Sequence, residues 1–149
     1  MTSGLYQEFL SIQNELVHLN PAALLCYSCS CAERLVPVVE QFGEKYLANT
    51  MRDVLDKYWQ LPIHFDVPMQ EHEQSKLFEQ LYDEALGAAY QKAQDYTLLL
   101  IADAIGAIYY VIQYSNSLDR TIASATSEFV FGAVDRFVSG LLDPGPYAI

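Results

Sequence analysis

The stretch Thr97–Tyr114, TLLLIADAIGAIYYVIQY, is apolar along almost its whole length. Its one formal charge is Asp103, and its other residues are apolar, small or uncharged. A helix that is hydrophobic on nearly every side is buried in a soluble protein, with other helices around it. The small residues Ala102, Ala104 and Gly106 would let those neighbours approach closely. The sequence therefore predicts an all-α bundle with this helix at its centre.

This stretch does not have the features of a membrane span. Its strictly apolar part, Leu98 to Ile112, is interrupted by Asp103 and is shorter than the ~20 residues that a span needs. A carboxylate in the middle of a bilayer costs at least about 2.5 kcal/mol. The first residues, MTSGLYQEFLSIQNEL, lack the basic segment and apolar core of a secretory signal. We therefore expect a soluble, cytoplasmic protein that does not bind membranes.

Apolar spacing, caps and breakers predict about six helices in a single domain, residues 1–149, with 143–149 as a C-terminal tail. Asn20 is the expected cap of the second helix, and Pro37 should kink that helix or divide it in two. Asn49 or Thr50 is expected near the start of the third, and Ser115-Asn116-Ser117 should cap the last. Phe137 is expected on the inward stripe of the last helix. The helices are expected within 3–20, 21–43, 47–62, 77–90, 97–114 and 118–143, and Gln91 to Asp95 is either a turn into the central helix or a continuation of it.

The chain is strongly acidic. Nineteen Asp and Glu residues against eight Lys and Arg give a formal net charge of −11. Such a potential repels the phosphates of nucleic acids and attracts a basic protein. We therefore expect no nucleic-acid binding, and we expect a basic partner.

Many of these acids lie between residues 66 and 95, where Lys76 and Lys92 are the only basic residues. A solvated helix face is the common explanation of such a run. A docking surface is the functional one, because complementary charge speeds encounter with a basic protein. The candidate partner-binding residues are Asp66, Glu71, Glu73, Glu79, Asp83 and Glu84.

Three charges fall on the helices expected in the core. Glu33 and Arg34 interrupt the apolar second helix, and Asp103 interrupts the central one. Because an unpaired buried charge is very costly, these groups should pair with one another or reach the rim. We predict an Arg34–Asp103 or an Arg34–Glu33 contact, with a structural role favoured over a catalytic one.

Motifs for metal binding and catalysis are weak. Cys26, Cys29 and Cys31 are closely spaced, but no fourth Cys or His lies nearby, and an odd number of thiols fits a reducing compartment. The cluster of His64, Glu71, His72 and Glu73 lacks the His-Glu-x-x-His spacing of a metalloprotease. There is no Gly-rich phosphate loop and no Gly-x-Ser-x-Gly elbow. We expect no metal, no cofactor and no enzymatic activity.

The segment Cys31-Ala32-Glu33-Arg34-Leu35-x-Pro37, followed by Phe42 and by Val54-Leu55-Asp56-x-x-Trp59, resembles the opening of the YjaG-like family of uncharacterised bacterial helical proteins. In that family a Cys-Glu-Arg-x-x-Pro segment precedes a helix with Leu-Asp-x-x-Trp. A related Cys-Ala-Glu-x-x-x-Pro start is similar to that of a class of immunity proteins found beside polymorphic toxins. The resemblance implies a helical protein that binds and blocks a toxin domain.

The leading hypothesis is a bacterial immunity protein that neutralises its toxin through the acidic surface. The alternative is a small-ligand-binding or enzymatic protein with a polar pocket around Glu33, Arg34 and Asp103. A third possibility is a homodimer with exposed tyrosines such as Tyr6 or Tyr147 in its interface.

Overall fold

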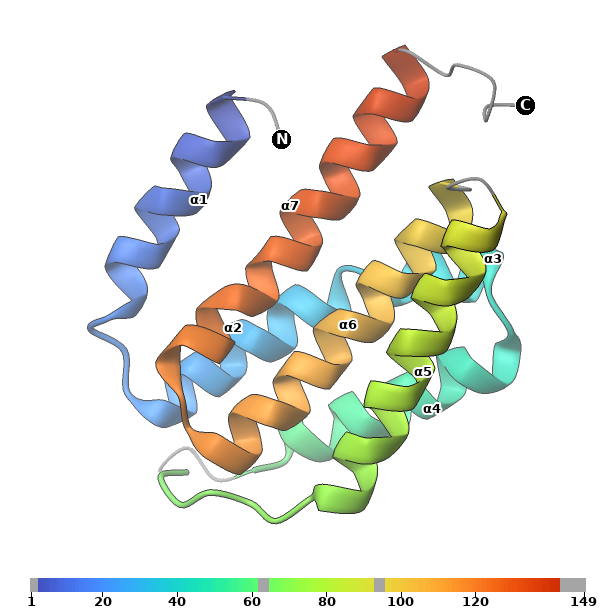
Figure 1. The fold of residues 1–149 in the computed structure, drawn as a ribbon. Helices are drawn as coiled ribbons and strands as arrows, with labels where there is room; N and C mark the ends of the chain where they lie inside the picture. Colours follow the sequence, from blue (N-terminus) through green and yellow to red (C-terminus); the bar gives the residue numbers. More distant parts are fainter. Residues whose placement is uncertain (1–2, 62–64, 93–95, 143–149) are drawn as a thin grey trace.

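A computed structural model describes residues 3–61, 65–92 and 96–142, and within these ranges it contains seven α-helices and no strand (Figure 1). The all-α prediction is confirmed. The helices are α1 Ser3–Leu16, α2 Pro21–Glu33, α3 Val36–Phe42, α4 Lys45–Trp59, α5 His72–Gln91, α6 Tyr96–Ser117 and α7 Arg120–Leu142.

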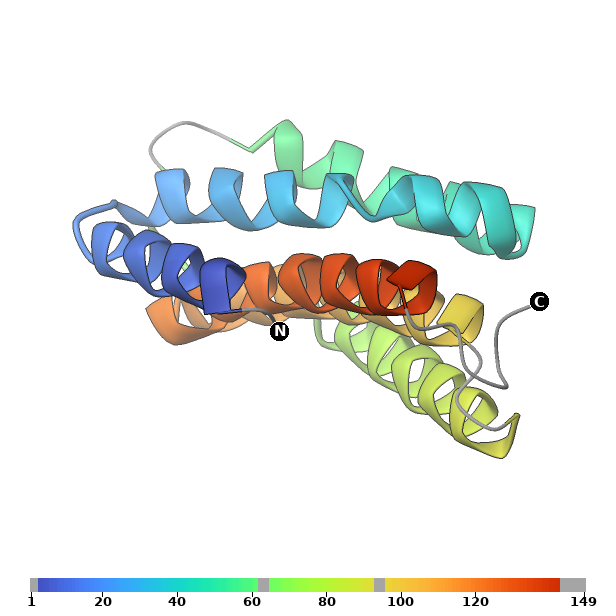
Figure 2. The same ribbon diagram turned by 90° about the horizontal axis from the view of Figure 1, so that it is seen from above.

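The helices form two layers (Figure 2). Helices α1, α7, α6 and α5 lie side by side in one layer, and α2, α3 and α4 cover it from behind (Figure 1). Helix α6 contacts α5 and α7 in its own layer and α2, α3 and α4 in the other. Twelve of its residues are buried, so its predicted central position is confirmed.

The second expected helix is divided. Pro37 has no N–H, and its ring would clash with the carbonyl of Glu33 in a continuous helix. The helix therefore ends at Glu33 and resumes at Val36, with Pro37 in the first turn of α3. At the other end, Asn20 Oδ1 accepts a hydrogen bond from the Ala23 N–H at 2.9 Å, which confirms the predicted cap.

Helix α4 begins at Lys45, soon after Gly43 ends α3 in an extended conformation. Asn49 and Thr50, expected near its start, therefore lie in its second turn. The hydroxyl of Thr50 donates to the carbonyl of Tyr46 at 2.9 Å, inside the helix.

The predicted cap of α7 is wrong. Ser117 ends α6, and its hydroxyl donates to the carbonyl of Gln113 at 2.8 Å. Leu118 then has a φ of 56°, a left-handed conformation that stops the helix. The first turn of α7 is capped by Asp119, which accepts a hydrogen bond from the Thr121 N–H at 2.9 Å.

Phe137 does not face the core as predicted and is 58% exposed. The C-terminal part of α7 extends beyond the N-terminal end of α6 (Figure 1). Apolar side chains on this part of α7 therefore have few neighbours to pack against. Ala133, one turn earlier, is buried.

Two stretches, Pro21–Phe42 and Tyr96–Ser117, are long and apolar enough to cross a membrane. In Pro21–Phe42, 50% of the most apolar window is buried inside the bundle. In Tyr96–Ser117, 67% of the corresponding window is buried. Core helices of soluble proteins share this length and composition. The expectation of a soluble, cytoplasmic protein therefore stays a prediction.

The close packing of α6 can be tested at Gly106. A methyl group there would lie 2.4 Å from the ring of Phe129 and 2.9 Å from the ring of Tyr82, so both rings would have to move. Gly106→Ala should lower the free energy of unfolding by about 1–3 kcal/mol. Gly87→Ala, in α5, would meet nothing within 4 Å and should raise it by about 0.5–1 kcal/mol. Urea unfolding followed by circular dichroism measures both, and equal stabilities would contradict the packing described here.

Candidate functional site

Asp103 is the one charged side chain that is buried among the described residues. It lies in the middle of α6 and is 6% exposed. Arg136, on α7, donates from Nε to Asp103 Oδ2 at 3.0 Å. Burial raises the pKa of Asp103, and Arg136 opposes this rise without cancelling it. The ion pair joins the two longest helices of the bundle.

Glu33 forms a separate cluster on the other layer. Arg52, on α4, donates from Nη1 to Glu33 Oε2 at 2.5 Å and from Nη2 to Glu40 Oε1 at 3.1 Å. The indole N–H of Trp59 donates to Glu33 Oε1 at 3.1 Å. One arginine therefore bridges carboxylates from α2 and α3.

The predicted Arg34–Asp103 and Arg34–Glu33 contacts are wrong. Arg34 follows the last residue of α2 and is exposed, and no ion pair joins it to either carboxylate among the described residues. The ion pairs depend on which helices pack together. Helix α7 packs against α6, so Arg136 pairs with Asp103. Helix α4 packs against α2 and α3, so Arg52 pairs with Glu33. The three charges therefore do not form one polar pocket.

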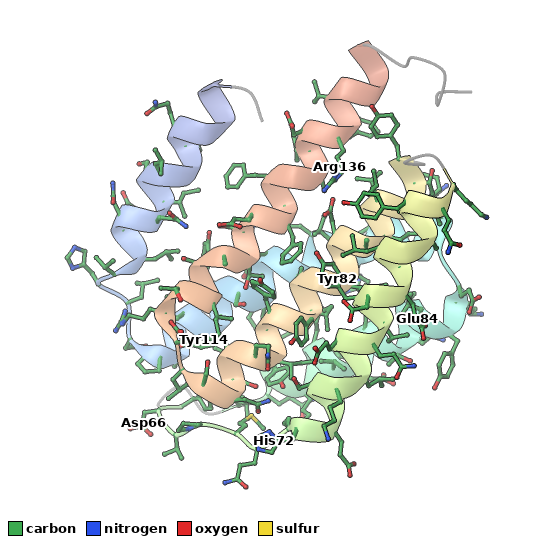
Figure 3. All side chains as sticks on the ribbon, in the orientation of Figure 1. Asp66, His72, Tyr82, Glu84, Tyr114 and Arg136 are labelled. Atoms are coloured by element: carbon green, nitrogen blue, oxygen red, sulfur yellow. The ribbon has the colours of Figure 1, made fainter. Side chains whose placement is uncertain are left out.

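The candidate partner-binding residues do not form one continuous surface. Asp66 precedes α5 and lies far from Glu84 (Figure 3). Glu71 is half-buried, forms an ion pair with Lys57, and is held by a hydrogen bond from its N–H to Asn116 Oδ1 at 2.9 Å. It is therefore part of the structure that fixes the segment before α5 to the end of α6. The four exposed acids of α5 remain available for docking: Glu73, Glu79, Asp83 and Glu84.

Glu84 borders an apolar groove that the sequence did not predict. The groove has a volume of about 610 Å³ and is lined by α4, α5, α6 and the end of α3. Its floor includes Leu98, Ile101 and Ile105 of the central helix. Two exposed aromatic residues stand at its edge, Phe42 at 55% and Tyr46 at 80% exposure.

Two carboxylates line this groove, Glu44 at the start of α4 and Glu84 on α5, and its lining includes no Lys, Arg or His. Asp83 is exposed beside Glu84. Glu84 is held by a hydrogen bond from Gln80 Nε2 to its Oε1 at 3.0 Å. An apolar floor with an acidic border is suited to a partner segment that carries both apolar and basic side chains.

Sequence reasoning missed Glu44 and Tyr46. The sequence did contain one signal: Tyr46 is an aromatic residue that lies off the apolar stripe of its own helix. This signal points to a groove only once α5 and α6 are known to lie across from the start of α4.

The thiols of the chain and its described histidines are not grouped as metal ligands. Cys29 and Cys31 are buried, whereas Cys26 is exposed. Burial raises the pKa of the Cys29 thiol to about 12, which keeps it protonated. In the part of the chain that the structure describes, no three His, Cys, Asp or Glu side chains are grouped as metal ligands. His72 is exposed, and His64 lies outside the described residues.

Comparisons with protein-family models, with curated proteins and with solved structures found no match to this chain. The family resemblance of residues 31–59 therefore stays a prediction.

The raised pKa of Asp103 gives a pH-dependence of stability. A folded-state pKa above the ordinary value of 3.8 means that the folded chain binds this proton more tightly than the unfolded chain. The quantity to follow is the free energy of unfolding of the native protein minus that of Asp103→Asn. This difference should fall as the pH rises from 3.8 through the folded-state pKa of Asp103, and it should be constant at higher pH. Urea unfolding at a series of pH values measures this difference.

Asp53→Asn is the control, because Asp53 is exposed on α4. The interpretation is contradicted if the native protein gains stability relative to Asp103→Asn over the same pH interval.

Proposed function

We propose that this protein is a non-enzymatic binding protein that neutralises a bacterial toxin domain by direct contact in the cytoplasm. The observation that supports the proposal is the apolar groove between α4 and α5 with carboxylates on its border. The family resemblance of residues 31–59 supports the choice of a toxin as the partner.

The groove can supply affinity. Exposed apolar surface at Phe42, Tyr46 and Leu77 would leave water on binding, and burial of apolar area yields roughly 25 cal/mol per Å² before the costs of association. Large aromatic side chains at such an edge are typical of residues that dominate binding energy.

The acidic border can supply orientation and speed. Glu44, which precedes α4, and Glu84, on α5, both line the groove. A basic partner segment laid along the groove would therefore meet carboxylates from two elements. The overall charge of −11 would add long-range attraction to such a partner.

Asp66 and Glu71 are no longer included in the proposed contact surface. Asp66 is far from the groove, and Glu71 is engaged with Lys57. Glu73 and Glu79 contribute only to the negative field of α5. The homodimer hypothesis cannot be developed from Tyr6 and Tyr147, because the side chain of Tyr6 and the whole of Tyr147 lie outside the described residues.

Co-expression tests the function directly. The chain is expressed with the C-terminal domain of the protein encoded immediately upstream, and cell survival and co-elution on a sizing column are measured. We expect the domain to be toxic alone, and we expect survival and co-elution when both are present. Toxicity without rescue, or rescue without co-elution, would contradict neutralisation by direct contact.

Charge reversal tests the surface. The double variant Glu44→Lys/Glu84→Lys should slow association with that domain at low salt by at least about tenfold, because it replaces attraction at the groove by repulsion. Stopped-flow mixing measures the association rate. The matched control Glu8→Lys/Glu15→Lys makes the same change in net charge at exposed positions on α1. If both variants slow association equally, the total charge matters and the groove does not.

A further inference from the structure

A second cleft lies further along the central helix than the groove, towards the C-terminus of α6. It has a volume of about 710 Å³ and is lined by α1, the C-terminal half of α6 and the N-terminal half of α7. This volume falls within the range of small-molecule sites, roughly 300–1,000 Å³. The site residues discussed above do not line it.

The chemistry of this cleft is mixed. Val17, Ile122 and Ala125 give it an apolar strip. Tyr109 and Tyr110 line it from α6, with ring centroids 6.0 Å apart and planes inclined at 66°. Aromatic rings at an angle of this kind present faces to which a cation can bind.

Some polar groups around the cleft are already used within the protein. Gln113 donates from Nε2 to the Tyr109 hydroxyl at 2.9 Å, and its Oε1 accepts from Ser75 at 2.9 Å. The Ser124 hydroxyl donates to the carbonyl of Thr121 at 3.2 Å. The Tyr109 hydroxyl keeps its own O–H as a donor, so the charge of the cleft, more than its hydrogen bonding, distinguishes between ligands.

The cleft is also negative. Glu128 is its one charged lining residue and is exposed, and no described residue forms an ion pair with it. Arg120 is not among the lining residues; its guanidinium keeps its positive charge and donates to the carbonyls of Leu16 and Val17, at 3.4 and 3.2 Å. The carboxylates of Glu79 and Asp83 act on Tyr109 from α5.

We propose that this cleft binds an aliphatic polyamine. One ammonium group binds the carboxylate of Glu128, a second lies against the faces of Tyr109 and Tyr110, and the methylene chain contacts the apolar strip. A free carboxylate, aromatic faces and an apolar strip fit this class better than an anion, which Glu128 would repel. A neutral ligand would not use the charge of Glu128.

The test is an NMR titration of the full chain, with its tyrosine rings labelled with ¹³C, at constant ionic strength. The ligands are butane-1,4-diamine and its uncharged analogue butane-1,4-diol. The variants Tyr109→Phe and Tyr110→Phe assign the two ring signals. We expect the diamine to shift both signals and the diol to leave them in place.

Substitution of the carboxylate tests the charge contact. Glu128→Gln should weaken diamine binding by about tenfold, because it removes one charge-assisted contact. Asp53→Asn, which removes one charge on α4 away from the cleft, should bind like the native chain.

Three results would overturn the proposal: no shift of these signals by the diamine, equal shifts by diamine and diol, or equal weakening by Glu128→Gln and Asp53→Asn. The last result would show unspecific attraction to an acidic protein. Thermal unfolding of each variant confirms that it is folded. Because Glu128 is exposed, Glu128→Gln should melt like the native chain. The readout needs no toxin, so it is independent of the proposed function.

Discussion

The close approach of neighbouring helices to α6 is the constraint on which the rest of the structure depends. Small residues along this helix, Ala102, Ala104, Gly106 and Ala107, leave room for side chains from its neighbours. At Gly106 the rings of Phe129 and Tyr82 occupy the space that a side chain would take. Because α6 is apolar on nearly every side, helices of both layers must pack against it to exclude water. The two-layer bundle follows from this requirement.

Three of the eight basic residues form ion pairs with acids that are buried or half-buried. With eight Lys and Arg against nineteen acids, most carboxylates cannot be paired. Arg136 reaches the buried Asp103, Arg52 reaches Glu33 and Glu40, and Lys57 reaches Glu71. The remaining acids lie largely on the surface, where water solvates them and where a cationic partner can approach them. The negative character of both the groove and the cleft is a consequence of this distribution.

The groove and the cleft differ in chemistry, and helix α6 lines both of them. Residues of α6 near its N-terminus line the groove, and residues near its C-terminus line the cleft. The groove has an apolar floor with exposed aromatic residues, which suits a protein surface. The cleft combines aromatic rings with one free carboxylate, which suits a small cation. The two sites share no lining residue, so substitutions on α4 and α7 can probe them separately.

The sequence alone determined the helical class, the buried position of α6, the cap at Asn20 and the break at Pro37. These features follow from local causes: the period of the apolar residues, a side chain that bonds a nearby N–H, and a ring without an N–H. The tertiary structure alone decided which arginine pairs with Asp103 and which residues form the groove. The reason is that a charge or an exposed ring acquires its role from helices distant in sequence, and their mutual packing is not encoded in any local pattern.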